Sequence, residues 1–268
     1  MRYLLSKTSL PVLQRLAHER TLCAFDFDGT LAPIVACPNR AKMRASTRKL
    51  LERAAALYPS IVVSGRSRED VLKKLSGIPL AGVFGNHGAE AAGMKRQDPR
   101  VKQWEAALKS ELANLPGVWI EDKGSSLAVH FRQSAQPAQS RRRISAAVSK
   151  LNAVRAFGGK KVINLVANGA PTKGDAVAAE RDRLRCNWIL YVGDDQNDED
   201  AFALQCDIVA IRIGKKRHTQ ARFYLKSQAE IDQLLSRLID LRTAESAESV
   251  RSGFAAQKLL RRRDTSNS

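Results

Sequence analysis

Short apolar runs alternate with amphipathic stretches over the first 90 residues of the chain, and the same pattern returns after residue 169. The apolar runs have the length of buried strands, and the stretches between them show helical spacing. This alternation predicts βα units around a doubly wound, mostly parallel sheet, which is an α/β fold. The expected strands cover residues 21–27, 61–66, 81–86, 187–195 and 207–213, and the expected helices cover 46–58 (with Ser46 as N-cap), 67–75, 174–183, 198–205 and 228–242.

Between these two parts the pattern changes. Residues 100–115 and 138–151 show helical spacing, and each is followed by a pair of alternating strands. The second pair, residues 154–167, is expected to turn at Gly158-Gly159. We therefore expect a small α+β domain inserted into the α/β core. The predicted division is a core of residues 1–99 plus 169–243, an inserted cap of residues 100–168, and a basic, flexible tail of residues 244–268.

Composition describes an ordinary globular chain of 268 residues, 44% hydrophobic and 27% charged. No apolar run approaches the roughly 20 residues that span a bilayer. The N-terminal stretch is interrupted by Lys7, Pro11 and Arg15, so no signal peptide is expected. The four cysteines are scattered without a C-x-x-C pair, which favours free thiols, mostly buried, and a cytoplasmic location.

The net charge is unusual, at +18 from 45 basic and 27 acidic residues. Such an excess is compatible with nucleic-acid binding, and equally with attraction of a small anionic substrate. The basic clusters at 141–143, 215–217 and 261–263 lack interleaved aromatic residues and any zinc-finger or helix-turn-helix spacing. A small anionic molecule is therefore the preferred partner, nucleic acid is unlikely, no membrane contact is expected, and a monomer is favoured.

The stretch AFDFDGTL places Asp26 and Asp28 two residues apart at the end of the first expected strand. Residues i and i+2 share one face of a strand, so both carboxylates would point the same way. Two neighbouring like charges are costly unless a cation lies between them. Taken alone, the pair is compatible with a metal or phosphate site and equally with an acidic strand end before a turn.

Three further polar stretches follow expected strands or precede an expected helix: SGR at 64–66, PTKGD at 171–175 and GDDQND at 193–198. In a doubly wound sheet these positions meet at the carboxyl edge, where ligands bind. Three carboxylates, those of Asp26, Asp28 and Asp194, would suit Mg²⁺. Asp26 could then attack phosphorus, Asp28 could act as acid and base, and Ser64 and Lys173 could hold phosphate oxygens.

In these four stretches the sequence resembles the haloacid dehalogenase superfamily of phosphohydrolases, and the inserted segment resembles its C2B cap. FDFDGTLAPI, VVSGR, FGNHGAE, EDKGSSLAVHFR and GDDQNDEDAF are similar to segments of the trehalose-6-phosphate phosphatases. The resemblance covers residues 20–240 approximately. It implies a Rossmann-like hydrolase core, a phosphatase activity, and Mg²⁺ as cofactor.

The resemblance also implies individual roles. Asp26 would be the nucleophile and Asp28 the acid and base. Asp194 and the backbone carbonyl of Asp28 would join Asp26 on the metal, with Asp195 and Asp198 supporting that site. The implied substrate residues are Thr30, which would orient Asp28, Gly65 beside the phosphate, and Arg66, His87, Glu121 and Lys123, which would touch the sugar or close the cap.

Some of these residues also have simpler explanations. Thr30 could cap a turn, and His87 could be a turn residue between Asn86 and Gly88. Glu121 and Lys123 share a strand face and could form an ordinary surface ion pair. His130 and Arg132 lie on the next expected strand, where simple exposure would account for them.

One position departs from the family pattern. The family usually has a second cap glutamate before the third motif, and here Asn164 occupies the corresponding place. An amide can bind sugar hydroxyls, but it lacks the charge-assisted acceptor. The sequence therefore predicts a Mg²⁺-dependent phosphatase of trehalose 6-phosphate acting through an aspartyl-phosphate. The alternatives are a phosphatase of another sugar phosphate, such as sucrose phosphate or a glucosyl- or mannosyl-glycerate phosphate, and, less favoured, a non-catalytic anion- or nucleic-acid-binding protein.

Overall fold

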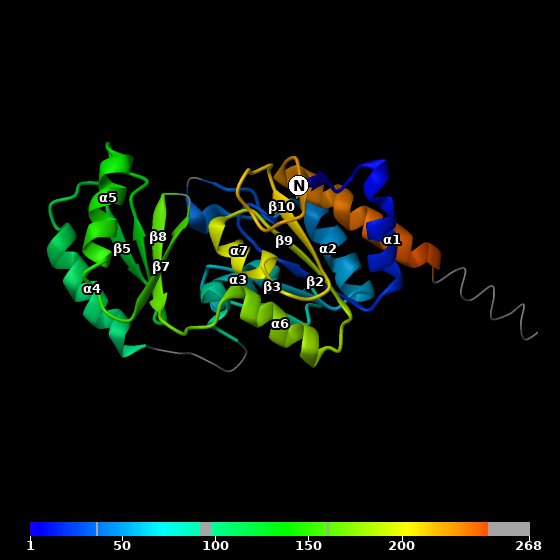
Figure 1. Cartoon of the computed structure of the whole chain (residues 1–268), viewed down its shortest axis with the longest axis horizontal. Helices are drawn as coiled ribbons and strands as arrows, with labels where there is room; N and C mark the ends of the chain where they lie inside the picture. The colour runs from blue at the N-terminus through cyan, green and yellow to red at the C-terminus, as the bar shows by residue number, and fades with distance from the viewer. Residues whose placement is uncertain (36, 92–97, 160, 246–268) are drawn as a thin grey trace, which may run out of the picture.

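The computed structural model describes residues 1–35, 37–91, 98–159 and 161–245. Two sheets organise this part of the chain (Figure 1). A seven-stranded sheet forms the core, and a four-stranded sheet with two helices forms a cap at its side. The predicted α/β fold with an inserted antiparallel cap is confirmed.

All neighbouring strands of the core sheet are parallel, in the order β1-β11-β10-β9-β2-β3-β4. The central strand β2 is buried along its whole length, as expected where helices cover both faces. The strands are β1 (Arg2–Tyr3), β2 (Thr21–Phe25), β3 (Ser60–Val63), β4 (Gly82–Phe84), β9 (Trp188–Gly193), β10 (Ile208–Ile213) and β11 (Phe223–Leu225).

Two layers of helices enclose this sheet. One apolar cluster joins the sheet to α1 (Leu10–His18), α2 (Ala45–Leu57), α3 (Arg68–Leu75) and a helix over residues 231–245. A second cluster joins the opposite face to α6 (Lys173–Arg183) and α7 (Glu199–Phe202). This double covering leaves the carboxyl edge of the strands open toward the cap.

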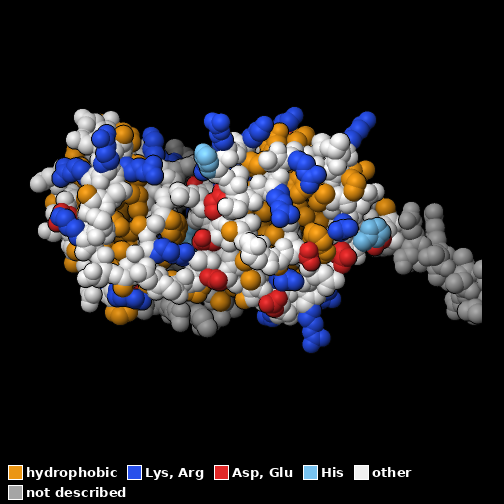
Figure 2. Space-filling model, viewed as in Figure 1, with side chains coloured by type: hydrophobic (Ala, Val, Ile, Leu, Met, Phe, Trp, Pro, Cys, Tyr) orange, Lys and Arg blue, Asp and Glu red, His pale blue; other side chains and the backbone are white. Residues whose placement is uncertain are grey.

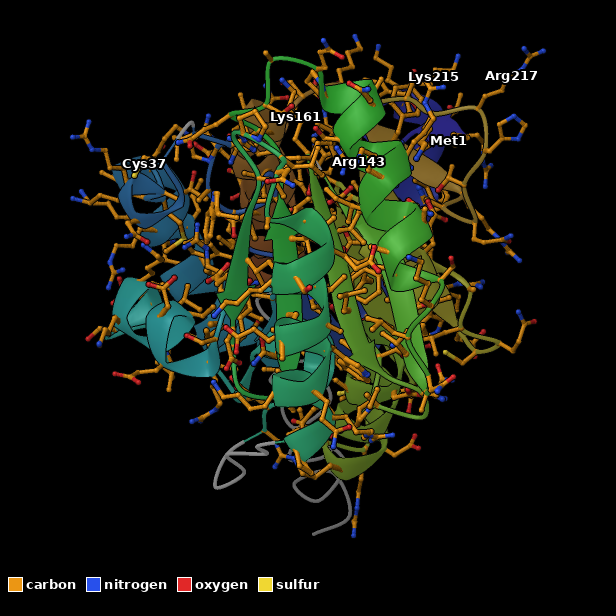
Figure 3. The ribbon with its side chains drawn as sticks, turned by 90° about the vertical axis from the view of Figure 1, so that its left-hand side faces the viewer. Met1, Cys37, Arg143, Lys161, Lys215 and Arg217 are labelled. Carbon is orange, nitrogen blue, oxygen red and sulfur yellow. The ribbon has the colours of Figure 1, made fainter. Side chains whose placement is uncertain are left out.

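The cap sheet is antiparallel, in the order β5-β6-β8-β7. Its strands are β5 (Trp119–Asp122), β6 (Ser126–His130), β7 (Val154–Gly159) and β8 (Val162–Ala167). Helices α4 (Pro99–Leu112) and α5 (Pro137–Val148) cover one face of this sheet and lie in front of it in Figure 3. The other face is left to the core.

Several details differ from the expectations. The strands β1 and β11 were not predicted, because they are too short to show a pattern. The helix α1 was not predicted either; the proline that interrupts the sequence there lies in its first turn. Ser46 is not the N-cap of α2: Arg44 takes that position, and the Ser46 hydroxyl donates to Asp232 instead. Gly158 and Gly159 do not form the turn, because both pair with β8 as the last residues of β7.

Basic side chains are common on the face drawn in Figure 2. Figure 2 shows lysine and arginine side chains spread over both cap and core. Within the described residues, no helix is long and apolar enough to cross a membrane. All four cysteines are free; Cys23 and Cys186 are buried as expected, Cys206 is half-buried and Cys37 is exposed. The expected tail lies outside the described residues from 246 onward, and residues 244–245 still belong to the last helix.

Candidate active site

A cavity of about 650 Å³ lies between core and cap. The core side comes from the segments that follow β2, β3 and β9, so the cavity lies at the carboxyl edge where such sheets bind ligands. The predicted site residues that line it are Asp26, Asp28, Gly65, Arg66, His87, Glu121, Lys123, Asn164, Asp194 and Asp195. The other predicted residues, Thr30, Ser64, Lys173 and Asp198, are buried outside this lining.

Asp26 is fixed at the floor of the cavity by a buried lysine. It directly follows β2, and its backbone N–H donates to Val192 of β9. The Nζ of Lys173, at the start of α6, donates to Oδ1 of Asp26 and to Oδ1 of Asp198, both at 2.8 Å. Lys173 therefore holds one oxygen of Asp26 and leaves the other carboxylate oxygen to the cavity.

The charges at this floor act strongly on one another. Burial raises the pKa of Asp26 well above its ordinary value, Lys173 opposes this rise, and Asp198 and Asp194 add to it. Burial alone would lower the pKa of Lys173, but the carboxylates of Asp198 and Asp26 raise it above the ordinary value. Asp26 and Asp198 thus share one ammonium group and the Asp194 carboxylate lies close to both, which leaves room for a further cation.

Asp198 supports the loop that follows β9. Its Oδ2 accepts from the backbone N–H groups of Asp194 and Asp195, both at 2.9 Å, and its Oδ1 also accepts from the Tyr191 hydroxyl. The guanidinium of Arg212, which is 6% exposed, donates to the backbone carbonyls of Asp194 and Asp195. Neither Tyr191 nor Arg212 was predicted, because single residues inside apolar strands carry no pattern that marks them.

The donor set suits Mg²⁺. Carboxylate oxygens of Asp26, Asp194 and Asp198 come within 4.8 Å of one another, and oxygen is the donor that this cation prefers. Both oxygens of Asp198 already accept hydrogen bonds, so Asp198 fits a supporting role better than direct ligation. Gly29 permits the approach of Asp194, since a Cβ at position 29 would overlap that carboxylate. The φ angle of Gly29 is +84°, which also favours glycine there. Asp26 and Asp194 could thus hold a metal.

Asp28 is held by Arg66. The guanidinium donates to both carboxylate oxygens of Asp28, Nε to Oδ2 at 2.5 Å and Nη2 to Oδ1 at 2.7 Å, and it also donates to Asp70. The expected contact between Asp28 and Thr30 is not made, because the buried Thr30 Oγ1 has no hydrogen-bond partner among the residues that the structure describes. Orientation of Asp28 therefore comes from Arg66.

Ser64, Gly65 and His87 pack together beside this pair. The Ser64 hydroxyl accepts from the backbone N–H of Arg66 at 3.2 Å. A Cβ at Gly65 would overlap the His87 ring, so the glycine of SGR allows the imidazole to lie against the loop. Burial, together with the charges of Lys123 and Lys173, lowers the pKa of His87 well below its ordinary value, which favours the neutral ring.

Two buried polar atoms at the cavity make no regular hydrogen bond with any described residue. They are Nε2 of His87, whose ring lies beside the Asn164 side chain and whose Nδ1 lies 3.1 Å from the Asn197 amide nitrogen, and the amide oxygen of Asn197. Unpaired buried polar groups are rare in folded proteins, and both residues line the cavity. This arrangement goes beyond what a simple turn residue at position 87 would explain.

The cap reaches the core through hydrogen bonds near Asn86. The Asn86 side-chain nitrogen lies 2.5 Å from the Glu90 carboxylate, 2.9 Å from the Ser125 hydroxyl and 3.1 Å from the Lys123 carbonyl, which share its two hydrogens, and the amide oxygen accepts from Ser126. Asn86 and His87 both have positive φ, 44° and 60°, which turns the chain sharply between the two sheets. Asn86 was not predicted to have this role.

Glu121 and Lys123 do not form an ordinary surface pair. Lys123 Nζ donates to the Gly65 carbonyl at 2.9 Å, and it lies 3.9 Å from the Glu121 carboxylate. Glu121 instead receives a closer contact from His130 Nε2, at 2.9 Å. Burial would raise the pKa of Glu121, but the His130 hydrogen bond and the Lys123 charge lower it. Asn164 joins them on the cavity wall from β8.

Other cavity residues were missed or left undecided from sequence. From sequence, His130 and Arg132 could be exposed strand residues without a role at the site. Both line the cavity, and Arg132 donates to the Val35 carbonyl at 3.0 Å. Trp119 lines it too. The sequence could have predicted Trp119, because residues 119, 121 and 123 share one strand face and the other two were already candidate site residues.

This geometry agrees with comparisons to known proteins. A family described as trehalose-phosphatase matches residues 24–229. The chain belongs to the trehalose-phosphatase family. Two curated trehalose-phosphate phosphatases, from Mycobacterium avium and Mycobacterium tuberculosis, are 33% and 32% identical to this trehalose-phosphatase family member, covering 84% and 80% of its length. The chain spans 63% and 60% of their lengths.

Solved structures of phosphatases have the same fold as this trehalose-phosphatase family member. The C-terminal domain of trehalose-6-phosphate phosphatase from Candida albicans aligns with a TM-score of 0.73 at 21% identity, covering 86% of this chain and 97% of that one. A phosphatase of the haloalkanoate superfamily from Bacteroides thetaiotaomicron aligns at 0.62 and 15% identity, covering 84% and 96%. These likenesses confirm the fold that the resemblance to the haloacid dehalogenase superfamily implied.

Proposed function

We propose that this chain is a Mg²⁺-dependent phosphatase that hydrolyses trehalose 6-phosphate to trehalose and phosphate. The observation that supports it most directly is the Asp26 carboxylate at the cavity floor, which Lys173 holds by one oxygen while the other is free to react. Curated relatives with 32–33% identity are named trehalose-phosphate phosphatases. The proposal assigns residues 1–99 and 169–243 to catalysis and 100–168 to recognition.

In the proposed first step, Asp26 attacks phosphorus and the bond from phosphorus to the sugar oxygen breaks. Asp28 gives a proton to that oxygen, and the sugar leaves. In the second step Asp28 takes a proton from water, whose oxygen attacks the aspartyl-phosphate. Phosphate and the Asp26 carboxylate result. Mg²⁺ bound at Asp26, Asp194 and the Asp28 carbonyl would lower the repulsion between the carboxylates and the substrate phosphate.

Arg66 sets a condition on this cycle. It donates to both oxygens of Asp28, so Asp28 is held as an acceptor. These two bonds favour the charged carboxylate of Asp28 over the protonated form that gives the proton. A substrate phosphate is a competing acceptor for the guanidinium, so binding itself would release Asp28 for the acid step. Ser64 and Lys173 would hold the remaining phosphate oxygens.

Recognition of the sugar is proposed for the cap wall. Glu121 and Lys123 would bind hydroxyl groups, and the unpaired Nε2 of His87 would donate to one. Asn164 keeps a second candidate open, which is the same chemistry on another sugar phosphate. A cytoplasmic location, inferred from the free cysteines, stays a prediction.

Phosphate release from a panel of sugar phosphates tests the proposal. The panel contains trehalose 6-phosphate, sucrose 6-phosphate, glucose 6-phosphate and mannosyl-3-phosphoglycerate, each with Mg²⁺ and with EDTA, and Asp26→Asn serves as the inactive control. We expect Mg²⁺-dependent preference for trehalose 6-phosphate. Preference for another member would keep the chemistry and change the substrate, and release from none would overturn the proposal.

A further inference from the structure

The mouth of the cavity carries exposed apolar side chains that the proposed chemistry does not use. Trp119 is 46% exposed and Ile34 is 42% exposed, and both line the cavity, one from the cap and one from the core. Single exposed apolar residues are common, but two on facing parts of one cavity form an apolar rim. The Arg132 hydrogen bond to Val35 ties the two parts together at this rim.

Trp119 is held in a defined orientation. Its ring stacks on His130 with centroids 3.9 Å apart and planes at 10°. The imidazole is fixed in turn by Glu121, 2.9 Å from its Nε2. Since His130 covers one face of the indole, the exposed area of Trp119 belongs to its other face and its edges. A rigid aromatic face beside hydrogen-bonding groups suits a ligand that is apolar on one side and hydroxylated at its rim.

The position of Trp119 separates it from the phosphate end. Lys123, which reaches the Gly65 carbonyl, lies four residues further along the chain than Trp119, the first residue of β5. Along an extended strand this corresponds to about 13 Å. A ligand with phosphorus at Asp26 therefore reaches Trp119 with its far end rather than with the ring that carries the phosphate.

We propose that Trp119, backed by His130, is the platform of a second subsite that binds the sugar ring without the phosphate, through the C–H groups of one ring face. The inference rests on the proposed function, because it needs a substrate with two rings. It makes Trp119 a specificity-determining residue that separates disaccharide phosphates from monosaccharide phosphates. Trp119 takes no part in the bond-breaking steps.

The test compares kcat/KM for trehalose 6-phosphate with that for glucose 6-phosphate in Trp119→Ala and Trp119→Phe. We expect Trp119→Ala to lower this ratio about tenfold, mainly through KM for the disaccharide, and Trp119→Phe to restore most of it. Leu72→Ala is the matched control, since Leu72 is 38% exposed and lies outside the cavity lining. An unchanged ratio in Trp119→Ala would overturn the proposal.

A binding measurement separates this outcome from failure of the proposed function. If the wild-type protein does not hydrolyse trehalose 6-phosphate, tryptophan fluorescence of Asp26→Asn is titrated with trehalose, sucrose and glucose. A change with the disaccharides that exceeds the change with glucose, and that disappears in the Trp119→Ala background, would support the platform without hydrolysis. Equal responses to all sugars, or none, would refute it.

Discussion

Two lysines, Lys173 behind the cavity floor and Lys123 on the cap wall, make opposite kinds of contact. The Lys173 side chain is 1% exposed, and its Nζ lies 2.8 Å from two carboxylates, which raise its pKa despite burial. The Lys123 side chain is 14% exposed and donates to a neutral carbonyl, and burial lowers its pKa despite Glu121. The floor is thus fixed by mutual charge neutralisation, whereas the cap wall keeps charge available for a ligand.

The largest loss of activity is expected from a substitution at the cavity floor. We expect Asp26→Asn to lower turnover by about 10⁴-fold or more, because the amide cannot attack phosphorus. The amide has nearly the same shape, so circular dichroism and Tm should stay close to the wild-type values or rise slightly, since an unfavourable buried charge is removed. Wild-type turnover in this variant would refute the mechanism.

Exchange of the two lysines for methionine tests the contrast directly. Lys173→Met leaves Asp26 and Asp198 buried without their cation, and we expect it to lower the free energy of unfolding by about 3 kcal/mol. Lys123→Met removes one hydrogen bond to a neutral group, with an expected loss of about 1 kcal/mol. Urea unfolding of both variants at pH 7 is the measurement. Equal losses would show that the floor is no more tightly coupled than the cap wall.

Metal binding should distinguish acidic residues of the floor from those of the cap. We expect Mg²⁺ at about 100 times its Kd to add about 2.7 kcal/mol to the stability of the wild-type protein. Asp194→Asn should lose this effect, and EDTA should reverse it in the wild type. Glu121→Gln, an acid of the same cavity but of the cap, should keep it. Thermal unfolding reports this without any substrate, and a Mg²⁺ effect retained in Asp194→Asn would contradict the site.

Cap substitutions should act on affinity rather than on chemistry. We expect Glu121→Gln to raise KM for trehalose 6-phosphate about tenfold, because a charge-assisted acceptor becomes a neutral one, with a smaller effect on kcat. Steady-state kinetics give both constants. A fall in kcat as large as the rise in KM would place Glu121 in the chemical steps instead.

The smallest expected effect concerns Asn164. Asn164→Glu restores the acceptor usual in the family, and we expect kcat/KM for trehalose 6-phosphate to rise by about threefold. Asn164→Gln adds the same length without charge and serves as the control. A fall in Asn164→Glu, with a gain on another sugar phosphate of the panel, would show that the asparagine is adapted to that sugar.

The sequence predicted the core better than the cap wall for a physical reason. Asp26 and Asp194 follow strands of a parallel sheet, whose carboxyl ends share one edge, and Lys173 begins the helix that leads into the strand before Asp194. These three residues could therefore be brought together from topology alone. Contacts between the sheets depend on how they are oriented, which no local pattern records. The hydrogen bond of Lys123 to Gly65, the role of Asn86 and the Arg66 contact with Asp28 were therefore visible only in three dimensions.

Other errors came from local chemistry overridden by tertiary contacts. Ser46 has the side chain of an N-cap, yet its hydroxyl binds Asp232 on the last helix. Gly158-Gly159 is a common turn pair, yet both residues complete β7, where Gly159 lies close to Asp195 and Asn164. Gly159 therefore leaves room for the neighbouring side chains rather than forming a turn.

The hydrogen bonds of Asn86 have a mechanical consequence. They join the core to the cap at the Lys123 carbonyl, so a rotation of the cap about this point leaves the residues near the phosphate end almost in place. Trp119 lies at the far end of β5, and a rotation of about 10° would displace it by about 2 Å over the 13 Å of extended strand. Lys123 would hardly move. The outer end of the cavity would therefore widen only when the Arg132 hydrogen bond to Val35 breaks, while the distances around the reacting phosphorus stay nearly constant.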